Sequence, residues 1–177
     1  MTDTLKTLDL TEIEEPKNQG PTWPELKEMM KTKEFITLYV MNFFSIFLGL
    51  FIANEYKVYW IASGYAPGDH FVTRVSSLGN FFNGMRFIWS ALLDHYSYKV
   101  VYGIMLTIEI VIGFSFPFVV QNTGVYVTWI CLGYLCLGGH FTLVPNECKK
   151  IFGKDTTQLY SYLYSYAGVT GVTECML

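Results

Sequence analysis

The chain has 177 residues and a formal net charge of −3; 51% of its residues are hydrophobic, 18% are aromatic and 15% are charged. Soluble domains usually contain roughly 25% charged residues, so this composition excludes an ordinary soluble protein. The slight acidity and the lack of a basic cluster also argue against a nucleic-acid partner, because phosphate binding needs concentrated Lys and Arg. We therefore expect an all-α membrane protein.

The first 34 residues form a polar tail, which we expect to lie in the cytoplasm. It contains no apolar core of a signal peptide, so the first membrane span itself is expected to direct insertion. Residues 2–20 have the polar composition of a disordered segment. Residues 23–33 mix apolar and basic side chains, and both a short amphipathic helix at the membrane surface and a solvated linker remain open.

Long uncharged stretches predict a transmembrane helical domain over residues 35–177. Phe35–Asn54 has no charged residue in 20 positions, which matches the ~20 residues needed to cross the hydrocarbon core. Polar turns, such as Gln121–Gly124, divide the later stretches. A single strand cannot pair its backbone in lipid, so each span is expected to be a helix. About five spans are predicted, at residues 35–54, 72–93, 100–120, 124–144 and 158–177, the fourth ending at Pro145.

The lysine and arginine distribution predicts the orientation. With five spans, nine basic residues fall on the side of the N-terminal tail, namely Lys6, Lys17, Lys27, Lys31, Lys33, Lys99, Lys149, Lys150 and Lys154. The opposite side and its edge hold Lys57 and Arg74. The N-terminus is therefore expected in the cytoplasm and the C-terminus on the opposite face.

The sequence contains no nucleophile–base pair, metal-binding cluster or phosphate loop, so nothing in it indicates an enzyme, a cofactor or a metal site. The cysteines lack the spacing of a zinc site, and three of them lie in or beside apolar stretches, where Cys usually acts as a small buried hydrophobe. The four cysteines of the chain are Cys131, Cys136, Cys148 and Cys175.

Arg86 is the most informative residue, because a charged side chain inside a membrane span is costly and usually functional. It precedes Asp94 by eight residues, roughly 12 Å along a helix. We expect it to face a protein interior or a water-filled cavity, where a guanidinium binds a carboxylate bidentately. An internal ion pair with Glu109 in the third span is the alternative.

Other polar residues in the spans are more ambiguous. His140 in the fourth span is either a proton relay or, preferred by us, a hydrogen-bonded interior residue. Tyr160 and Tyr164, with the serines beside them, form a polar face of the fifth span. That face either lines a cavity or packs against other helices, and both readings remain open.

The segment Asn83–Asp94, followed by Ser97-Tyr98-Lys99, resembles the signature turn of the major facilitator superfamily. The family signature begins with an Arg, which is followed by a Gly four residues later and an Asp four residues after that. A basic Gly-Arg-Lys comes next. The chain matches the Arg, the Asp and the final Lys; Ser90 stands for the Gly, and Ser97-Tyr98 stands for Gly-Arg. The resemblance implies that Arg86 binds a substrate carboxylate, while Asp94 and Lys99 stabilise a cytoplasmic gate.

Three further stretches resemble the branch of oxalate/formate antiporters and monocarboxylate porters. Lys33–Tyr39 is similar to the entry into that branch's seventh helix, Gly138–Phe141 to its tenth, and Tyr164–Gly168 to its eleventh. Relatives selective for dicarboxylates have a Lys in helix eleven where this chain has Ala167. The resemblance therefore implies a monocarboxylate-like organic anion, and not oxalate.

The resemblance covers helices seven to eleven of a twelve-helix transporter, whose substrate lies between two six-helix halves. It implies that the chain needs a first half, or a homo- or hetero-oligomeric partner, to move an anion across the bilayer by alternating access. Tyr160 and Tyr164 would then join Arg86 at the substrate, and Glu109 and His140 would act in a proton or ion-pair role. The alternative from another class is a non-transporting membrane subunit, or a truncated remnant, that only docks other helices.

Overall fold

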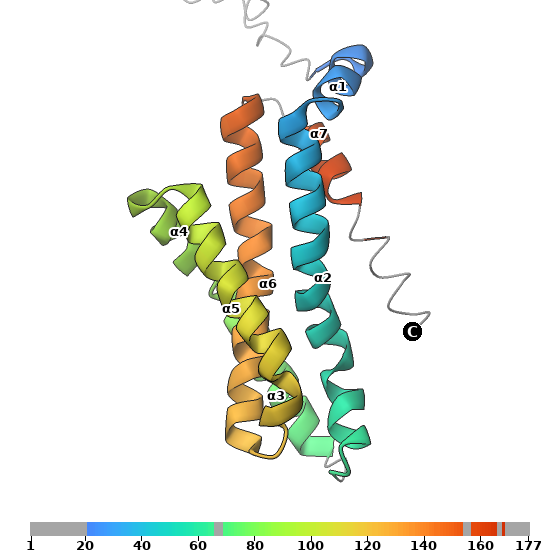
Figure 1. Cartoon of the computed structure of the whole chain (residues 1–177), viewed down its shortest axis with the longest axis vertical. Coiled ribbons are helices and arrows are strands. Elements are labelled where there is room, and N and C mark those ends of the chain that lie inside the picture. The colour runs from blue at the N-terminus through green and yellow to red at the C-terminus, as the bar shows by residue number, and fades with distance from the viewer. Residues whose placement is uncertain (1–20, 66–68, 154–156, 166–167, 169–177) are drawn as a thin grey trace, which may run out of the picture.

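The computed structural model describes residues 21–65, 69–153, 157–165 and 168. Within them the chain forms helices joined by short turns, and no β-strand (Figure 1). The helices are α1 (Trp23–Met30), α2 (Lys33–Ala62), α3 (Asp69–Gly84), α4 (Phe87–His95), α5 (Tyr98–Val119), α6 (Thr123–Phe152) and α7 (Thr157–Leu163).

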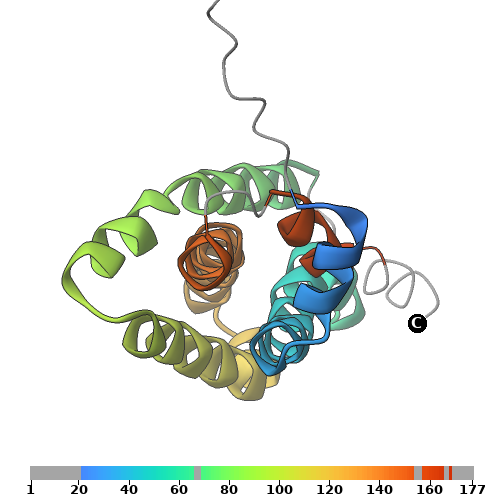
Figure 2. The same ribbon diagram turned by 90° about the horizontal axis from the view of Figure 1, so that it is seen from above.

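The central element of the bundle is α6, which α2, α3, α4 and α5 surround (Figure 2). Its middle is buried nearly all round, from Ile130 to His140, because it contacts neighbours on several sides. The surrounding helices bury one face each. On α5, for example, Tyr102, Met105, Glu109 and Ile112 recur at helical spacing and are buried.

Three helices, α2, α5 and α6, are long and apolar enough to cross a membrane. Large apolar side chains also cover the outside of the bundle: Phe44 is 72% exposed on α2, and Phe114 and Phe118 are 81% and 77% exposed on α5. In water such a surface would be unfavourable, whereas lipid tails are its natural solvent. The structure therefore agrees with a multi-pass membrane protein.

The second predicted span, residues 72–93, is not one straight helix. The chain bends between α3 and α4 at Met85 and Arg86, and Figure 2 shows the change of direction. The backbone tightens there, since Ile88 N–H donates to the Met85 carbonyl and Trp89 N–H to the Arg86 carbonyl, three residues back in each case. Gly84, a weak helix former, precedes the bend.

Two helices extend beyond the spans predicted for them. Helix α2 continues past residue 54 to Ala62, because Ile52, Tyr56 and Trp60 extend its buried face by two more turns. Helix α6 continues through Pro145 to Phe152. A proline removes one backbone hydrogen bond from a helix, and here packing on the neighbouring helices maintains the helix beyond it.

The remaining predicted elements are only partly covered. Helix α5 closely matches the predicted third span of residues 100–120. Of the fifth, residues 158–177, the structure describes α7 and little beyond it. The tail predicted to be disordered, residues 2–20, lies outside the described residues.

Local capping explains where several helices begin. The Thr32 hydroxyl accepts from Phe35 N–H at 3.3 Å at the start of α2. The predicted turn at Gln121–Gly124 supplies Asn122, whose side-chain oxygen accepts from Gly124 N–H at 3.1 Å and Val125 N–H at 3.3 Å. These contacts fix the entry into α2 and α6.

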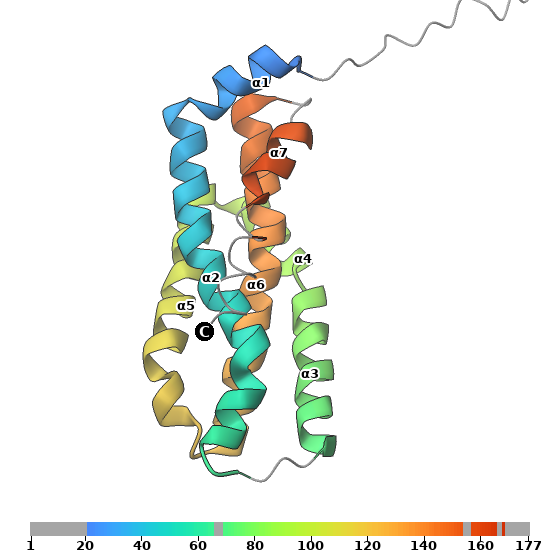
Figure 3. The ribbon, with the colours of Figure 1, turned by 90° about the vertical axis from the view of Figure 1, so that its right-hand side faces the viewer.

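Helix α1 lies across one end of the bundle, beside α7 (Figure 3). Thr22 and Glu25 form its capping box, and the Thr22 N–H donates to the Glu25 carboxylate at 2.9 Å, which lowers the pKa of that carboxyl. Leu26 is buried, and Trp23 contacts Tyr162 with ring centroids 6.0 Å apart. Residues 23–30 are therefore a docked helix in this structure.

Candidate functional site

A buried acid–base pair lies in the middle of the bundle. Glu109 on α5 and His140 on α6 are 3% and 0% exposed, and Glu109 Oε1 lies 2.8 Å from His140 Nε2. This is the one ion pair within 4 Å that the described residues form. Two buried titratable groups at hydrogen-bond distance can hold and release a shared proton.

Polar groups from three other positions surround this pair. The Tyr102 ring lies edge-on to the His140 ring with centroids 5.8 Å apart, and its hydroxyl lies 2.7 Å from the Ser45 hydroxyl on α2. The Tyr164 hydroxyl, just beyond α7, donates to the His140 carbonyl at 2.8 Å. We call Ser45, Tyr102, Glu109, His140 and Tyr164 the His140 cluster.

Two glycines let α6 approach the bend between α3 and α4. A Cβ on Gly138 would lie 2.6 Å from the Asn83 carbonyl oxygen and 3.2 Å from Arg86 Cβ. A Cβ on Gly139 would lie 2.5 Å from Met105 Sδ and 2.9 Å from Trp89 Nε1. Gly138 therefore lets α6 contact the bend, and Gly139 lets α6 contact Met105 of α5 and Trp89 of α4.

Arg86 stands at the N-cap position of α4 and is exposed on the described bundle, with no carboxylate within 4 Å in that part of the chain. Glu109 pairs with His140, so the alternative of an internal Arg86–Glu109 pair is wrong. The Cβ of Arg86 lies against Gly138 of α6, and Tyr164 reaches the same helix at the His140 carbonyl. Tyr160 in turn contacts Tyr164, with ring centroids 4.5 Å apart.

The structure thus gathers the residues singled out in the sequence around one stretch of α6, Gly138–His140. Arg86 Cβ lies against Gly138, the Tyr164 hydroxyl donates to the His140 carbonyl, and Glu109 pairs with the His140 ring. An exposed guanidinium is suited to binding a carboxylate.

The two residues assigned to a gate lie elsewhere, where α4 turns into α5. Asp94 lines a pocket of about 300 Å³ together with Glu147 and Lys150 of α6. Lys99 lines a different groove of about 470 Å³ between the first turns of α2 and α5, where Lys33, Glu34 and Glu147 also lie. Both are exposed, and Glu147 borders both hollows.

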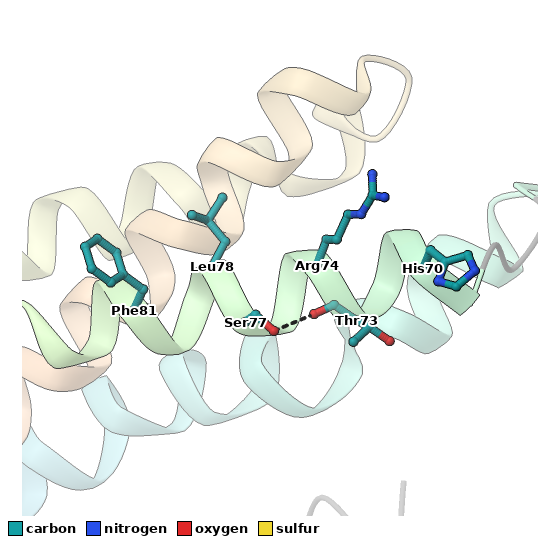
Figure 4. Close-up of a pocket in the computed structure, with 6 residues that line it drawn as sticks. All are labelled: His70, Thr73, Arg74, Ser77, Leu78 and Phe81. Atoms are coloured by element: carbon teal, nitrogen blue, oxygen red, sulfur yellow. Dashed lines mark hydrogen bonds between the residues drawn. The ribbon is translucent and has the colours of Figure 1, made fainter.

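A further hollow follows the outer face of α3. Figure 4 shows its lining residues on this helix, with Arg74, Leu78 and Phe81 projecting to the same side. His70 and Ser77 belong to the same stripe, and the Ser77 hydroxyl donates to the Thr73 carbonyl at 3.0 Å. Because a single helix provides the whole lining, this is an exposed helix face and not an enclosed site.

The sequence did not single out Tyr102 and Ser45. For Tyr102 a signal exists, because it precedes Glu109 by seven residues, two helical turns, and so shares its face of α5. Ser45 gives no such signal, since a lone hydroxyl in an apolar span commonly bonds to its own helix. Cys131, Cys136 and Cys148 are buried, as expected, and form no disulfide within the described residues.

None of the protein-family models, curated proteins or solved structures compared with the chain matches it.

Proposed function

We propose that the chain is part of a secondary transporter that moves a small, monocarboxylate-like organic anion across a membrane by alternating access. The observation behind the proposal is the bend at Met85–Arg86, held against Gly138 of α6. Broken helices at mid-membrane are a recurring way to build transporter sites, because the start of a half-helix favours negative charge. Arg86 adds a full positive charge at that point.

The exposure of Arg86 fits a site that is completed by other helices. In the described part of the chain, Arg86 is exposed and has no carboxylate within 4 Å. A first half, or an oligomeric partner, would supply the second wall of the cavity. One arginine matches one carboxylate, which favours a monoanion over a dianion.

The arrangement of the lysines supports the proposed topology. Lys33 begins α2, Lys99 lies in the first turn of α5, and Lys149 and Lys150 lie in the last turn of α6. Lys33 and Lys99 line the same groove, at the end of the bundle that α1 covers. We propose that this end faces the cytoplasm.

The second candidate function is a non-transporting subunit that only docks other helices. The exposed stripe on α3 favours it, because Leu78 and Phe81 are 42% and 63% exposed beside Arg74 (Figure 4). A subunit that only docks other helices does not require an exposed arginine at a helix bend. Anion binding at Arg86 is therefore expected of a transporter and not of a docking subunit.

Arg86→Gln is expected to weaken anion binding by about ten- to a hundredfold, the equivalent of one charge-assisted hydrogen bond or a bidentate pair. The full chain, purified in lipid nanodiscs, would be heated with increasing pyruvate or formate, and the rise in melting temperature would be recorded. Labelled pyruvate uptake by proteoliposomes would be measured in parallel. Arg74→Gln is the matched control, since it removes an exposed arginine of α3 away from the bend.

Protection by monocarboxylates that survives Arg86→Gln would contradict the role of this arginine. Oxalate is expected to protect less than pyruvate. If no anion protects the chain and no uptake occurs, while the chain still associates stably with other membrane helices, the docking function would be preferred.

A further inference from the structure

We propose that Glu109 and His140 form a proton-binding site that exchanges its proton with water at the α1 end of the bundle, past Tyr102 and Ser45. The inference deepens the proposed function, because it names the coupling ion, and it rests on that function only for the coupling role. Proton binding itself depends only on the buried pair and on a route by which water reaches it.

Within the described part of the chain, no other full charge pairs with these two residues. The groups that face the pair are the Tyr102 ring from α5, the Cys136 thiol of α6 and Ser45 from α2, while Tyr164 bonds to the His140 carbonyl. With one shared proton the pair is neutral, either as carboxylate with imidazolium or as carboxylic acid with imidazole. Without that proton it is a buried anion, so release is unfavourable until a charge or water approaches.

His140 Nδ1 adds a second, independent observation. This ring nitrogen is buried and has no hydrogen-bond partner in the described part of the chain. When the pair holds the shared proton, Nδ1 bears a hydrogen in both arrangements, and that hydrogen is unpaired. When the proton leaves, Nε2–H donates to the carboxylate and the Nδ1 lone pair is unpaired. Each protonation state leaves Nδ1 without a hydrogen-bond partner, so hydrogen bonding at this nitrogen does not favour one state over the other.

An access route leads to this pair between α2 and α5. Glu109 and Ser45 both line a pocket of about 250 Å³, which is large enough for several water molecules. Tyr102 lines the groove of about 470 Å³ at the α1 end, where Lys33, Lys99 and Glu147 lie. Met41 and Leu106 border both hollows, and the hydrogen-bonded Tyr102 and Ser45 hydroxyls join one to the other.

Towards the opposite end of the bundle, the pocket of Glu109 is bordered by an apolar side chain. Leu48 also borders the pocket of Glu109, and its side chain lies against Gly113, 3.2 Å from where a Cβ would stand. Beyond Leu48 another hollow of about 350 Å³ continues between α2 and α5, and its lining is mainly apolar, with Ile52 and Phe116 among its residues. The hydrogen-bonded Tyr102 and Ser45 hydroxyls therefore lead from the pair towards the α1 end, whereas Leu48 provides no hydroxyl relay in the other direction.

The transfer is a simple relay. A proton from water in the groove reaches the Tyr102 or Ser45 hydroxyl oxygen, which passes its own proton on towards the Glu109 carboxylate. The carboxyl then shares it with His140 Nε2. The hydroxyls end as they began, and the pair gains one proton and one unit of positive charge.

Proton binding is tested on the full chain in nanodiscs with His70→Asn and His95→Asn, which leave His140 as the one histidine of the chain. Nitrogen NMR of the labelled imidazole would be recorded between about pH 4 and 9, a range that spans the ordinary pKa values of Glu and His. We expect the chemical shifts of the His140 ring nitrogens and the infrared band of the Glu109 carboxyl to change together, in one step as the pH is varied. In Glu109→Gln that joint step is expected to disappear.

The route is tested by the rate at which the carboxyl band responds to a light-released proton. Tyr102→Phe and Ser45→Ala are expected to leave the extent of the change unaltered and to slow it about ten-fold, as one relay hydrogen bond is lost. Tyr134→Phe is the matched control, because its hydroxyl also bonds from one long helix to another, to the Ala53 carbonyl, and Tyr134 lines neither hollow of the route.

A His140 state that does not change over this pH range would overturn the proposal. A joint step with unchanged rates in both hydroxyl variants would overturn the access route. If the NMR step is present and no anion is taken up, the transporter function fails while the proton site stands.

Discussion

His140→Leu is expected to lower the free energy of unfolding by about 3–5 kcal/mol, because it leaves the Glu109 carboxyl buried beside an apolar side chain. Glu109 is 3% exposed, and within the described residues its carboxyl is held by His140 Nε2 at 2.8 Å. It will then stay protonated or draw water into the core, and each response costs free energy. Reversible unfolding in mixed micelles would give the value.

The double variant Glu109→Leu/His140→Leu separates lost pairing from lost packing. Two apolar side chains replace both charged partners, so the double variant is expected to be far more stable than the sum of the single variants predicts. Glu109→Gln, which keeps a hydrogen-bonding side chain, is expected to cost less than His140→Leu. Strictly additive losses would show that the two residues do not act as a pair.

The pairing itself was beyond sequence reasoning for a physical reason. The amino-acid sequence identified Glu109 and His140 as polar residues in apolar spans, and the cost of burying them made both worth attention. They are 31 residues apart on different helices, so their contact depends on how α5 and α6 rotate about their axes. Arg86 was an equally reasonable partner for Glu109 until its exposed position at the bend was known.

Helix type was predictable, whereas helix ends and bends were not. Lipid requires every backbone group to be paired, which makes helix the default for an apolar span. The end of α6 beyond Pro145 and the bend at Met85–Arg86 depend instead on tertiary packing. Gly138 illustrates this, since its sequence neighbours reveal nothing of the Asn83 carbonyl that lies against it.

Gly138→Ala is expected to destabilise the bundle by about 1–3 kcal/mol and to disturb the bend, because the new methyl group meets backbone. Its Cβ would lie 2.6 Å from the Asn83 carbonyl oxygen, and this oxygen moves only if α3 moves. Gly139→Ala is also expected to destabilise the bundle but to leave the bend in place, since its Cβ would meet Met105 Sδ at 2.5 Å and the buried Trp89 indole at 2.9 Å, which are side-chain atoms and not backbone. Thermal unfolding in nanodiscs would rank the variants.

Gly103→Ala is the matched control for these two variants. This glycine also lies inside a long helix, α5, but nothing stands within 4 Å of its Cβ position. The substitution is therefore expected to be neutral, or to stabilise the helix by up to about 1 kcal/mol through its higher helix propensity. If Gly138→Ala behaved like Gly103→Ala, α6 would not be in close contact with the bend. Arg86 would then lose the α6 backbone that lies against its Cβ, and the anion site proposed around it would have no fixed wall.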